Sequence, residues 1–242
     1  MTMLVWDRAT ERRYETGLSH GVLFVKAISG SNAGSYTKGV AWNGLISVTE
    51  SPSGAEETAL YANNGKYISL YSAEEFGGTI KAYTYPDAWE ICDGNYAGSR
   101  PGSGSTTYSY PGVRIAQQPR AGFGLCYRTQ VGNDAQGNDY GFKLHIVWNA
   151  MAKPSSKDYQ TINDSPEAIE LSWEYTTVPT PFTTPAFSNK FKPTSTIVLN
   201  SRQCDQTKLN NLMNKIYGTS NVDPQLPTPD QVLTDMEVAT TS

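Results

Sequence analysis

The sequence predicts a mainly β fold, a sandwich or barrel that carries one or two short helices and a C-terminal extension. Short runs rich in Val, Ile, Thr, Tyr, Phe and Trp alternate with Gly, Pro, Asn, Asp and Ser. The 15 Tyr against 7 Phe indicate surfaces that are half packed and half wet. A chain of 242 residues is long enough for one main β domain with an appendage.

The first strands are predicted near the N-terminus. After a polar opening, residues 20–28 (HGVLFVKAI) form the first clear apolar run. Residues 40–50 (VAWNGLISVTE) are predicted as a strand interrupted at Asn43 and Gly44. A tight turn or bulge at that dipeptide requires a positive φ, which glycine adopts freely.

Two further segments have the two-residue period of half-buried strands, residues 66–72 and 79–85. In the first of them Ile68 and Leu70 share one face, which we expect to be the packed one. Residues 73–78 (AEEFGG) are expected to form the turn between the two strands.

The middle of the chain predicts a hairpin and one more strand. Residues 86–90 begin with proline and indicate a single helical turn, which the Gly, Ser and Tyr-rich loop 95–112 follows. Residues 123–131 and 140–148 alternate cleanly as hairpin arms, and residues 168–176 repeat the pattern with one solvated face.

A change of composition after residue 177 suggests a domain boundary. Residues 178–185 hold three prolines, which a central strand does not tolerate. We therefore expect a β domain at 1–178 and, at 179–242, an extension that packs on its own domain or reaches a neighbour.

The extension itself is predicted to contain a short strand and short helices. The strand is expected at residues 196–200. Residues 206–217 place apolar side chains at helical spacing, with Asp205 as N-cap and Gly218 as the stop. Residues 228–231 (TPDQ) have the form of a capping box.

No pattern predicts a catalytic, cofactor-binding or metal-binding residue. The three cysteines are far apart and lack neighbouring ligands: Cys92, Cys126 and Cys204. His145 is expected to be a solvated or hydrogen-bonded strand residue rather than a base, since no nucleophile motif accompanies it. The chain has no phosphate-binding glycine motif, and the loop 133–139 lacks the full calcium pattern, which favours a hairpin turn.

Charge is distributed unevenly. Residues 49–93 hold two basic and eight acidic side chains, whereas residues 100–160 hold seven basic and three acidic ones. This is either an ordinary mixed surface or a pair of complementary patches that steer one copy onto the next. The net charge of -4 argues against tight DNA binding. No stretch has the ~18 apolar residues of a membrane span, so we expect no membrane contact and synthesis in the cytoplasm.

Several separate motifs point to one family. In chain order they are AWNGL (41–45), ESPSGAE (50–56), LYA (60–62), SAEEFG (72–77), AYTYPD (82–87), FGLCYRT (123–129), VGND (131–134), YGFKLH (140–145), INDSPE (162–167) and LPTPD (226–230). Together they resemble the major tail tube protein of long-tailed, non-contractile bacteriophages (siphoviruses). The resemblance runs from about residue 20 to residue 177 and is weakest in the loop 95–110.

The resemblance implies a β sandwich or barrel of the tail tube type that assembles, in the host cytoplasm, into the tail of the virion. Its implied partners are copies of itself, in hexameric rings stacked into a hollow tube, and the tape-measure, tail terminator and distal tail proteins. DNA would pass through the lumen, and an acidic subunit would let this polyanion slide.

Six residues are the candidate subunit contacts. Glu74 and Glu75 directly precede Phe76, which we expect to be exposed, a pattern typical of an aromatic anchor with a charged rim. The other candidates lie in the motifs above and are Trp42, Asn43 and Arg128.

Two other functions compete with self-assembly. Exposed aromatics would also suit a carbohydrate-binding β sandwich on a virion or host surface. A glycosidase would need two carboxylates across a groove, and the adjacent pairs at 56–57 and 74–75 do not provide that arrangement. We therefore expect a protein that is not an enzyme.

Overall fold

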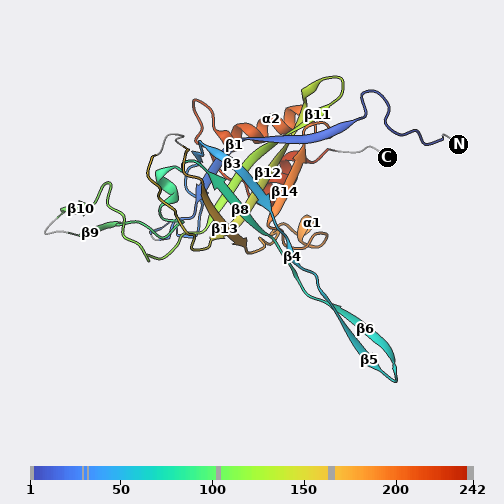
Figure 1. Ribbon diagram of the computed structural model, residues 1–242, viewed down its shortest axis with the longest axis horizontal. Coiled ribbons are helices and arrows are strands. Elements are labelled where there is room, and N and C mark those ends of the chain that lie inside the picture. The colour runs from blue at the N-terminus through green and yellow to red at the C-terminus, as the bar shows by residue number, and fades with distance from the viewer. Residues whose placement is uncertain (1–2, 29, 32, 102–104, 163–166, 239–242) are drawn as a thin grey trace.

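The computed structural model describes residues 3–28, 30–31, 33–101, 105–162 and 167–238, and it is built mainly of antiparallel strands (Figure 1). The strands are β1 (Arg13–Val25), β2 (Val40–Ala41), β3 (Leu45–Glu50), β4 (Ser53–Gly54), β5 (Glu57–Ala62), β6 (Gly65–Tyr71), β7 (Glu74–Glu75), β8 (Gly77–Ala82), β9 (Ser99–Pro101), β10 (Thr107–Ser109), β11 (Phe123–Asn133), β12 (Gly137–Ala152), β13 (Leu171–Thr177) and β14 (Thr196–Asn200). The helices are the 3-10 turn η1 (Asp87–Trp89), α1 (Pro185–Ser188), α2 (Gln206–Tyr217) and α3 (Pro229–Met236).

One large sheet organises the body. Its strand order is β2-β1-β11-β12-β13-β8-β3, and β14 also pairs with β12. β14 lies along residues 143–147 of β12, whereas β13 pairs only with residues 150–152 at its end. The sheet therefore folds over at the end of β12 and brings β3 close to β1 without closing a barrel. The predicted mainly β, sandwich-like class is confirmed.

The first core fills the space inside the folded sheet. Leu23 and Leu125 face the strands β13 and β8 there, together with a cluster of aromatic rings. Trp89 is central to this cluster, with its ring centroid 4.7 Å from that of Trp42 and 5.4 Å from that of Trp173. All five side chains are buried.

A second core lies on the opposite face of the same strands. Val22 and Phe24 point to this face, because successive strand residues alternate sides. Helices α2 and α3 cover it with Leu209, Leu212 and Val232. The central strands are therefore buried on both faces, which explains their nearly continuous apolar sequence.

The segment after residue 178 is part of the body. Strand β14 joins the main sheet, and the helices form half of the second core. The predicted boundary at residue 178 therefore does not separate two cores, and the predicted extension packs on its own domain. Its strand β14 and its helices α2 and α3 were predicted, whereas the short helix α1 was not. Helix α2 spans the predicted residues with Asp205 as N-cap and Gly218 as C-cap, and Thr228 and Gln231 form the capping box of α3.

Other predicted elements differ at their ends or in their pairing. β1 begins at Arg13, seven residues before the predicted start, because its polar first half pairs with β11 at the rim of the sheet. The turn at Asn43 is confirmed, with Gly44 at a φ of 75°. Residues 163–166 of one family-like motif and 102–104 of the loop 95–112 lie outside the described residues.

Candidate functional site

A long two-stranded arm projects from the body (Figure 1). Strands β3 and β8 leave the sheet and continue as the pairs β4 with β7 and β5 with β6. The chain reverses at Asn63 and Asn64, whose φ angles of 50° and 61° suit the tight turn of a hairpin. With ~3.3 Å per residue, the 13 residues from 51 to 63 span ~40 Å.

This arm corrects the prediction for residues 66–78. Lys66 to Tyr71 pair with β5, not with residues 79–85, and in place of the expected turn at 73–78 lie the short strand β7 and the start of β8. Ile68 and Leu70 are 47% and 50% exposed, so the face that we expected to be packed is open. The sequence asparagine-asparagine-glycine at 63–65 is the turn signal that would have revealed this hairpin.

The arm has an aliphatic face and a tyrosine face. Register pairs Leu60 with Ile68, and Leu70 follows two residues later on the same side. Tyr67 and Tyr71 alternate to the other side and are 76% and 68% exposed. A hairpin of two strands is marginally stable in water without a third strand or a packing surface. Both faces are therefore suited to contact with another molecule.

The arm is also acidic. Glu57 is paired with Lys66 and accepts a further hydrogen bond from Ser69. Within the described residues no cation lies within ion-pair distance of the other three arm carboxylates, which are Glu56, Glu74 and Glu75. The arm thus offers three unneutralised carboxylates to a partner.

A small polar cluster fixes the base of the arm. Glu50 is the last residue of β3, and its Oε1 accepts hydrogen bonds from the Tyr127 hydroxyl at 2.6 Å and from His145 Nδ1 at 3.0 Å. The imidazole stacks on the Tyr127 ring, and its Nε2 lies 3.0 Å from Thr129 Oγ1. Both ring nitrogens of His145 are therefore engaged, which gives this histidine a structural function at the arm base.

Acid should weaken this cluster. The hydrogen bond from His145 holds the pKa of Glu50 below its ordinary value of 4.5, against the opposing effect of burial. Its stabilisation is therefore present above that value and is lost as the pH falls through the lowered pKa. We expect the melting temperature of Glu50→Gln to fall less between pH ~6 and ~3 than that of the unmodified chain. If calorimetry shows the same fall in melting temperature for the variant and the unmodified chain, this assignment is contradicted, because all other carboxylates are present in both proteins.

The three adjacent candidate contacts lie at the root of the arm. Glu74 and Glu75 form β7 and are exposed. Phe76 is half-buried against the first core, and its carbonyl accepts hydrogen bonds from the backbone N–H and hydroxyl of Thr177. The prediction of an exposed aromatic anchor is wrong, because the strand runs on into β8 and turns this side chain inward.

The other three candidate subunit contacts lie outside the arm. Trp42 is buried in the first core and donates a hydrogen bond to the carbonyl of Thr84, so its side chain is not available to another copy. Asn43 is exposed in its turn. Arg128 is partly buried, with its guanidinium carbon 3.6 Å from the centroid of Phe142. Neither residue lies on the arm.

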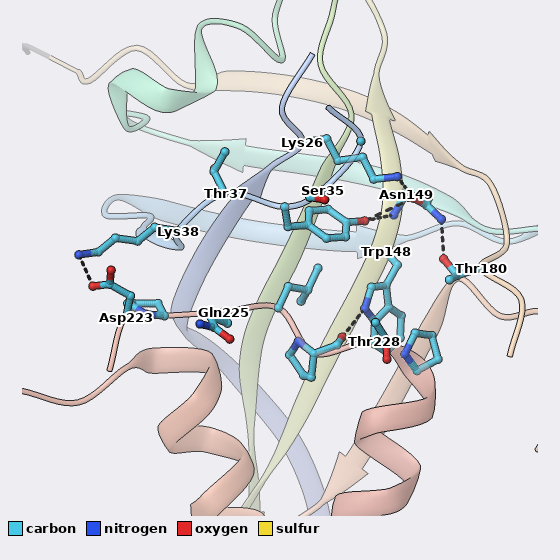
Figure 2. Close-up of a pocket in the computed structure, with 16 residues that line it drawn as sticks. Lys26, Ser35, Thr37, Lys38, Trp148, Asn149, Thr180, Asp223, Gln225 and Thr228 are labelled. Carbon is cyan, nitrogen blue, oxygen red and sulfur yellow. Dashed lines mark hydrogen bonds and ion pairs between the residues drawn. The ribbon is translucent and has the colours of Figure 1, made fainter. Parts of the chain in front are cut away.

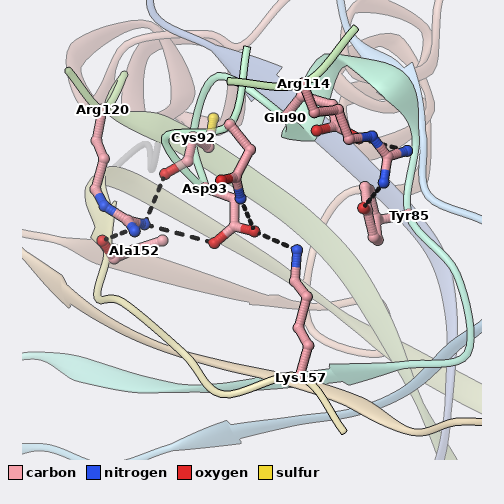
Figure 3. Close-up of polar contacts among 9 residues, drawn as sticks. Tyr85, Glu90, Cys92, Asp93, Arg114, Arg120, Ala152 and Lys157 are labelled. Carbon is pink, nitrogen blue, oxygen red and sulfur yellow. Dashed lines mark hydrogen bonds and ion pairs between the residues drawn. The ribbon is translucent and has the colours of Figure 1, made fainter. Parts of the chain in front are cut away.

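Much of the charge asymmetry is neutralised within the chain, as Figure 3 shows. Arg114 pairs with Glu90 at 2.7 Å, and buried Asp93 pairs with Lys157 at 2.6 Å and Arg120 at 3.5 Å. These pairs join the acidic and basic stretches inside one copy. For these five residues the pairs agree with an ordinary mixed surface, and contact between copies through the rest of the two stretches stays a prediction.

A cleft of about 600 Å³ lies between the end of β1 and residues 223–229 (Figure 2). Its polar groups bind one another: Lys26 and Tyr36 contact Asn149, and Trp148 Nε1 donates to the carbonyl of Pro227 at 2.8 Å. Burial raises the pKa of Tyr36 to about 12. The phenol is therefore a neutral hydrogen-bonding group, and the cleft brings together no nucleophile and base.

Within the described part of the chain, no group of three or more His, Cys, Asp or Glu side chains is placed to hold a metal ion. All three cysteines are free thiols, and burial raises the pKa of Cys92 to about 12. No helix in the same part is long and apolar enough to cross a membrane.

Neither the protein-family models nor the curated proteins contain a match to this chain. The arm and the surfaces of the body are therefore the features from which we infer a function.

Proposed function

We propose that this protein is a structural subunit that assembles with copies of itself through its projecting arm, as a tail tube subunit would. One observation carries the proposal: the arm exposes aliphatic side chains on one face and tyrosines on the other, and among the described residues its strands β5 and β6 pair only with each other. Stacked rings around a passage for DNA, completed by tape-measure, terminator and distal tail proteins, are the form of assembly that the family-like motifs suggest.

The energetics of the arm favour a partner. Leu60, Ile68 and Leu70 are each about half exposed, and burial of the exposed half of such a side chain contributes on the order of 1 kcal/mol. In a closed ring or a stack every subunit gives and receives the contact, so these contributions recur at each interface. A monomer would gain nothing from this pattern and would carry the risk of aggregation.

The exposed tyrosines also favour a second candidate, a carbohydrate-binding module. Tyr61, Tyr67 and Tyr71 are each at least two-thirds exposed, and amphipathic rings of this kind suit a partly wet contact. Self-assembly accounts for both the tyrosine face and the aliphatic face, whereas sugar binding accounts only for the tyrosines.

The double variant Ile68→Thr with Leu70→Thr tests the proposal. Threonine keeps the preference for strand while it removes apolar surface. Because each tenfold change in an equilibrium corresponds to ~1.4 kcal/mol, we expect the concentration needed for assembly to rise about tenfold. Electron microscopy and sedimentation of the concentrated protein would measure this change.

The matched control is Val198→Thr, at an exposed valine of β14 away from the arm. It should assemble as the unmodified chain does. A chain that stays monomeric at every concentration and binds glycans through its tyrosines would overturn the proposal in favour of the second candidate.

A further inference from the structure

A cationic cleft of about 550 Å³ lies where β1 begins and β14 ends. At its centre is the ring of Tyr140. The guanidinium carbon of Arg202 lies 4.7 Å from the centroid of this ring, and that of Arg13 lies 5.4 Å from it. Lys143 and Glu15, which pair with each other, line the same cleft.

Two glycines shape the surroundings of this cleft. A Cβ on Gly141 would lie 2.9 Å from Cγ of Arg202, and a Cβ on Gly132 would lie 2.3 Å from Cζ of Tyr14. The absence of side chains at these positions lets Arg202 and Tyr14 lie flat against the backbone. Tyr14 is held further by a hydrogen bond to Asn138. The side chain of Arg202 is therefore pre-positioned, which lowers the conformational entropy lost when a ligand binds.

The cleft has unused capacity for an anion. Within the described residues, neither Arg13 nor Arg202 has a carboxylate at ion-pair distance. A guanidinium offers several donors in a fixed plane that matches a carboxylate, and a ring beneath it keeps that plane in place. The chemistry of the cleft is therefore that of a receptor for oxyanions, carboxylates above all.

We propose that this cleft binds the acidic arm of a second copy, with Arg13 and Arg202 paired to the carboxylates of Glu74 and Glu75. This inference rests on the proposed function and names the surface that receives the arm. The complementarity is one of charge, because two cleft cations and three arm carboxylates lack ion-pair partners within the described chain. Glu74 and Glu75 are exposed at the root of the arm, so their carboxylates are open to a neighbouring copy.

Two charge-reversed variants test the pairing, and neither replaces a core residue. The cleft variant combines Arg13→Glu with Arg202→Glu, and the arm variant combines Glu74→Lys with Glu75→Lys. In either variant alone, arm and cleft carry the same sign, so we expect assembly followed by light scattering at ~0.1 M NaCl to slow about tenfold. In an equal mixture, each variant's arm faces the other's cleft with opposite sign, and the rate should return to within about threefold of the unmodified rate.

Salt and a matched control sharpen the test. The arm contact should weaken in ~1 M chloride, where the Debye length is ~3 Å, while apolar contacts persist. The control variant Arg8→Glu with Lys190→Glu makes the same change of net charge at residues that do not line the cleft. It should assemble at the unmodified rate. Circular dichroism should show all variants folded.

The outcomes separate this inference from the proposed function. Normal assembly of the cleft variant, or a mixture as slow as its components, would overturn the pairing while the unmodified chain still assembles. An unmodified chain that never assembles would overturn both. Binding of a labelled DNA oligonucleotide that the cleft variant loses, with its assembly intact, would instead assign the cleft to a phosphate backbone.

Discussion

A chain in which residues 54–74 are replaced by Asn-Gly is expected to fold as before and to lose assembly entirely. The replacement joins Ser53 to Glu75, which are register partners, through a two-residue turn that suits a hairpin. Phe76 keeps its place against the first core. The excised strands β5 and β6 pair only with each other, so the body loses no contact that holds its two cores together.

Calorimetry and electron microscopy would measure this result. The melting temperature should stay within a few degrees of the unmodified value, whereas rings, tubes or larger species should be absent at any concentration. The matched control is Asn64→Gly, which keeps the arm and its left-handed turn position. Assembly of the armless chain would exclude the arm as the assembly surface.

Truncation after Pro179 is expected to destroy the fold. If residues 179–242 were a separate extension, the cut would leave a soluble β domain. The structure leads us to expect the opposite. The cut removes five members of the second core: Leu199, Leu209, Leu212, Ile216 and Val232. At ~1.5–3 kcal/mol for each buried side chain, the loss is roughly 10 kcal/mol, as large as the whole stability of a typical domain.

The truncated chain would also expose the apolar face that contains Phe24, Ile146 and Trp148. We therefore expect it in the insoluble fraction or in a state that binds hydrophobic dyes, without near-ultraviolet dichroism. Removal of only residues 238–242, beyond the end of α3, serves as the control and should leave the melting temperature unchanged. A folded monomer after the longer cut would show that the first core is sufficient.

The fold was predictable wherever local signals decided it. Strand alternation located β11, β12 and β13, and capping residues located α2 and α3. Pairing was less predictable, because strands β5 and β6 expose the side chains that normally mark a packed face. The period of two reveals a strand, but burial depends on what lies opposite, and in the described chain β5 and β6 pair only with each other.

The candidate site was predictable only in part. Glu74 and Glu75 are exposed as expected, but Trp42 is a buried core residue and Phe76 is half-buried against the first core. The cationic cleft was missed because Arg13, Tyr140 and Arg202 are far apart in sequence and meet only when β1 and β14 have joined the sheet. The glycines beside them have no signature in a single sequence.

The base of the arm depends on residues that the ribosome makes late. Strand β8 is held on one side by β3, its neighbour in the chain, and on the other by β13, about a hundred residues further on. The surface that covers the outer face of the central sheet is not complete until residue 232 has been synthesised. A chain whose contacts join residues so far apart in sequence folds slowly. Until most of the chain is available, the base of the arm lacks the strand β13 that holds β8. Under the proposed assembly, a copy would become competent to polymerise only after the whole chain has folded, when it offers both an oriented arm and a finished cleft.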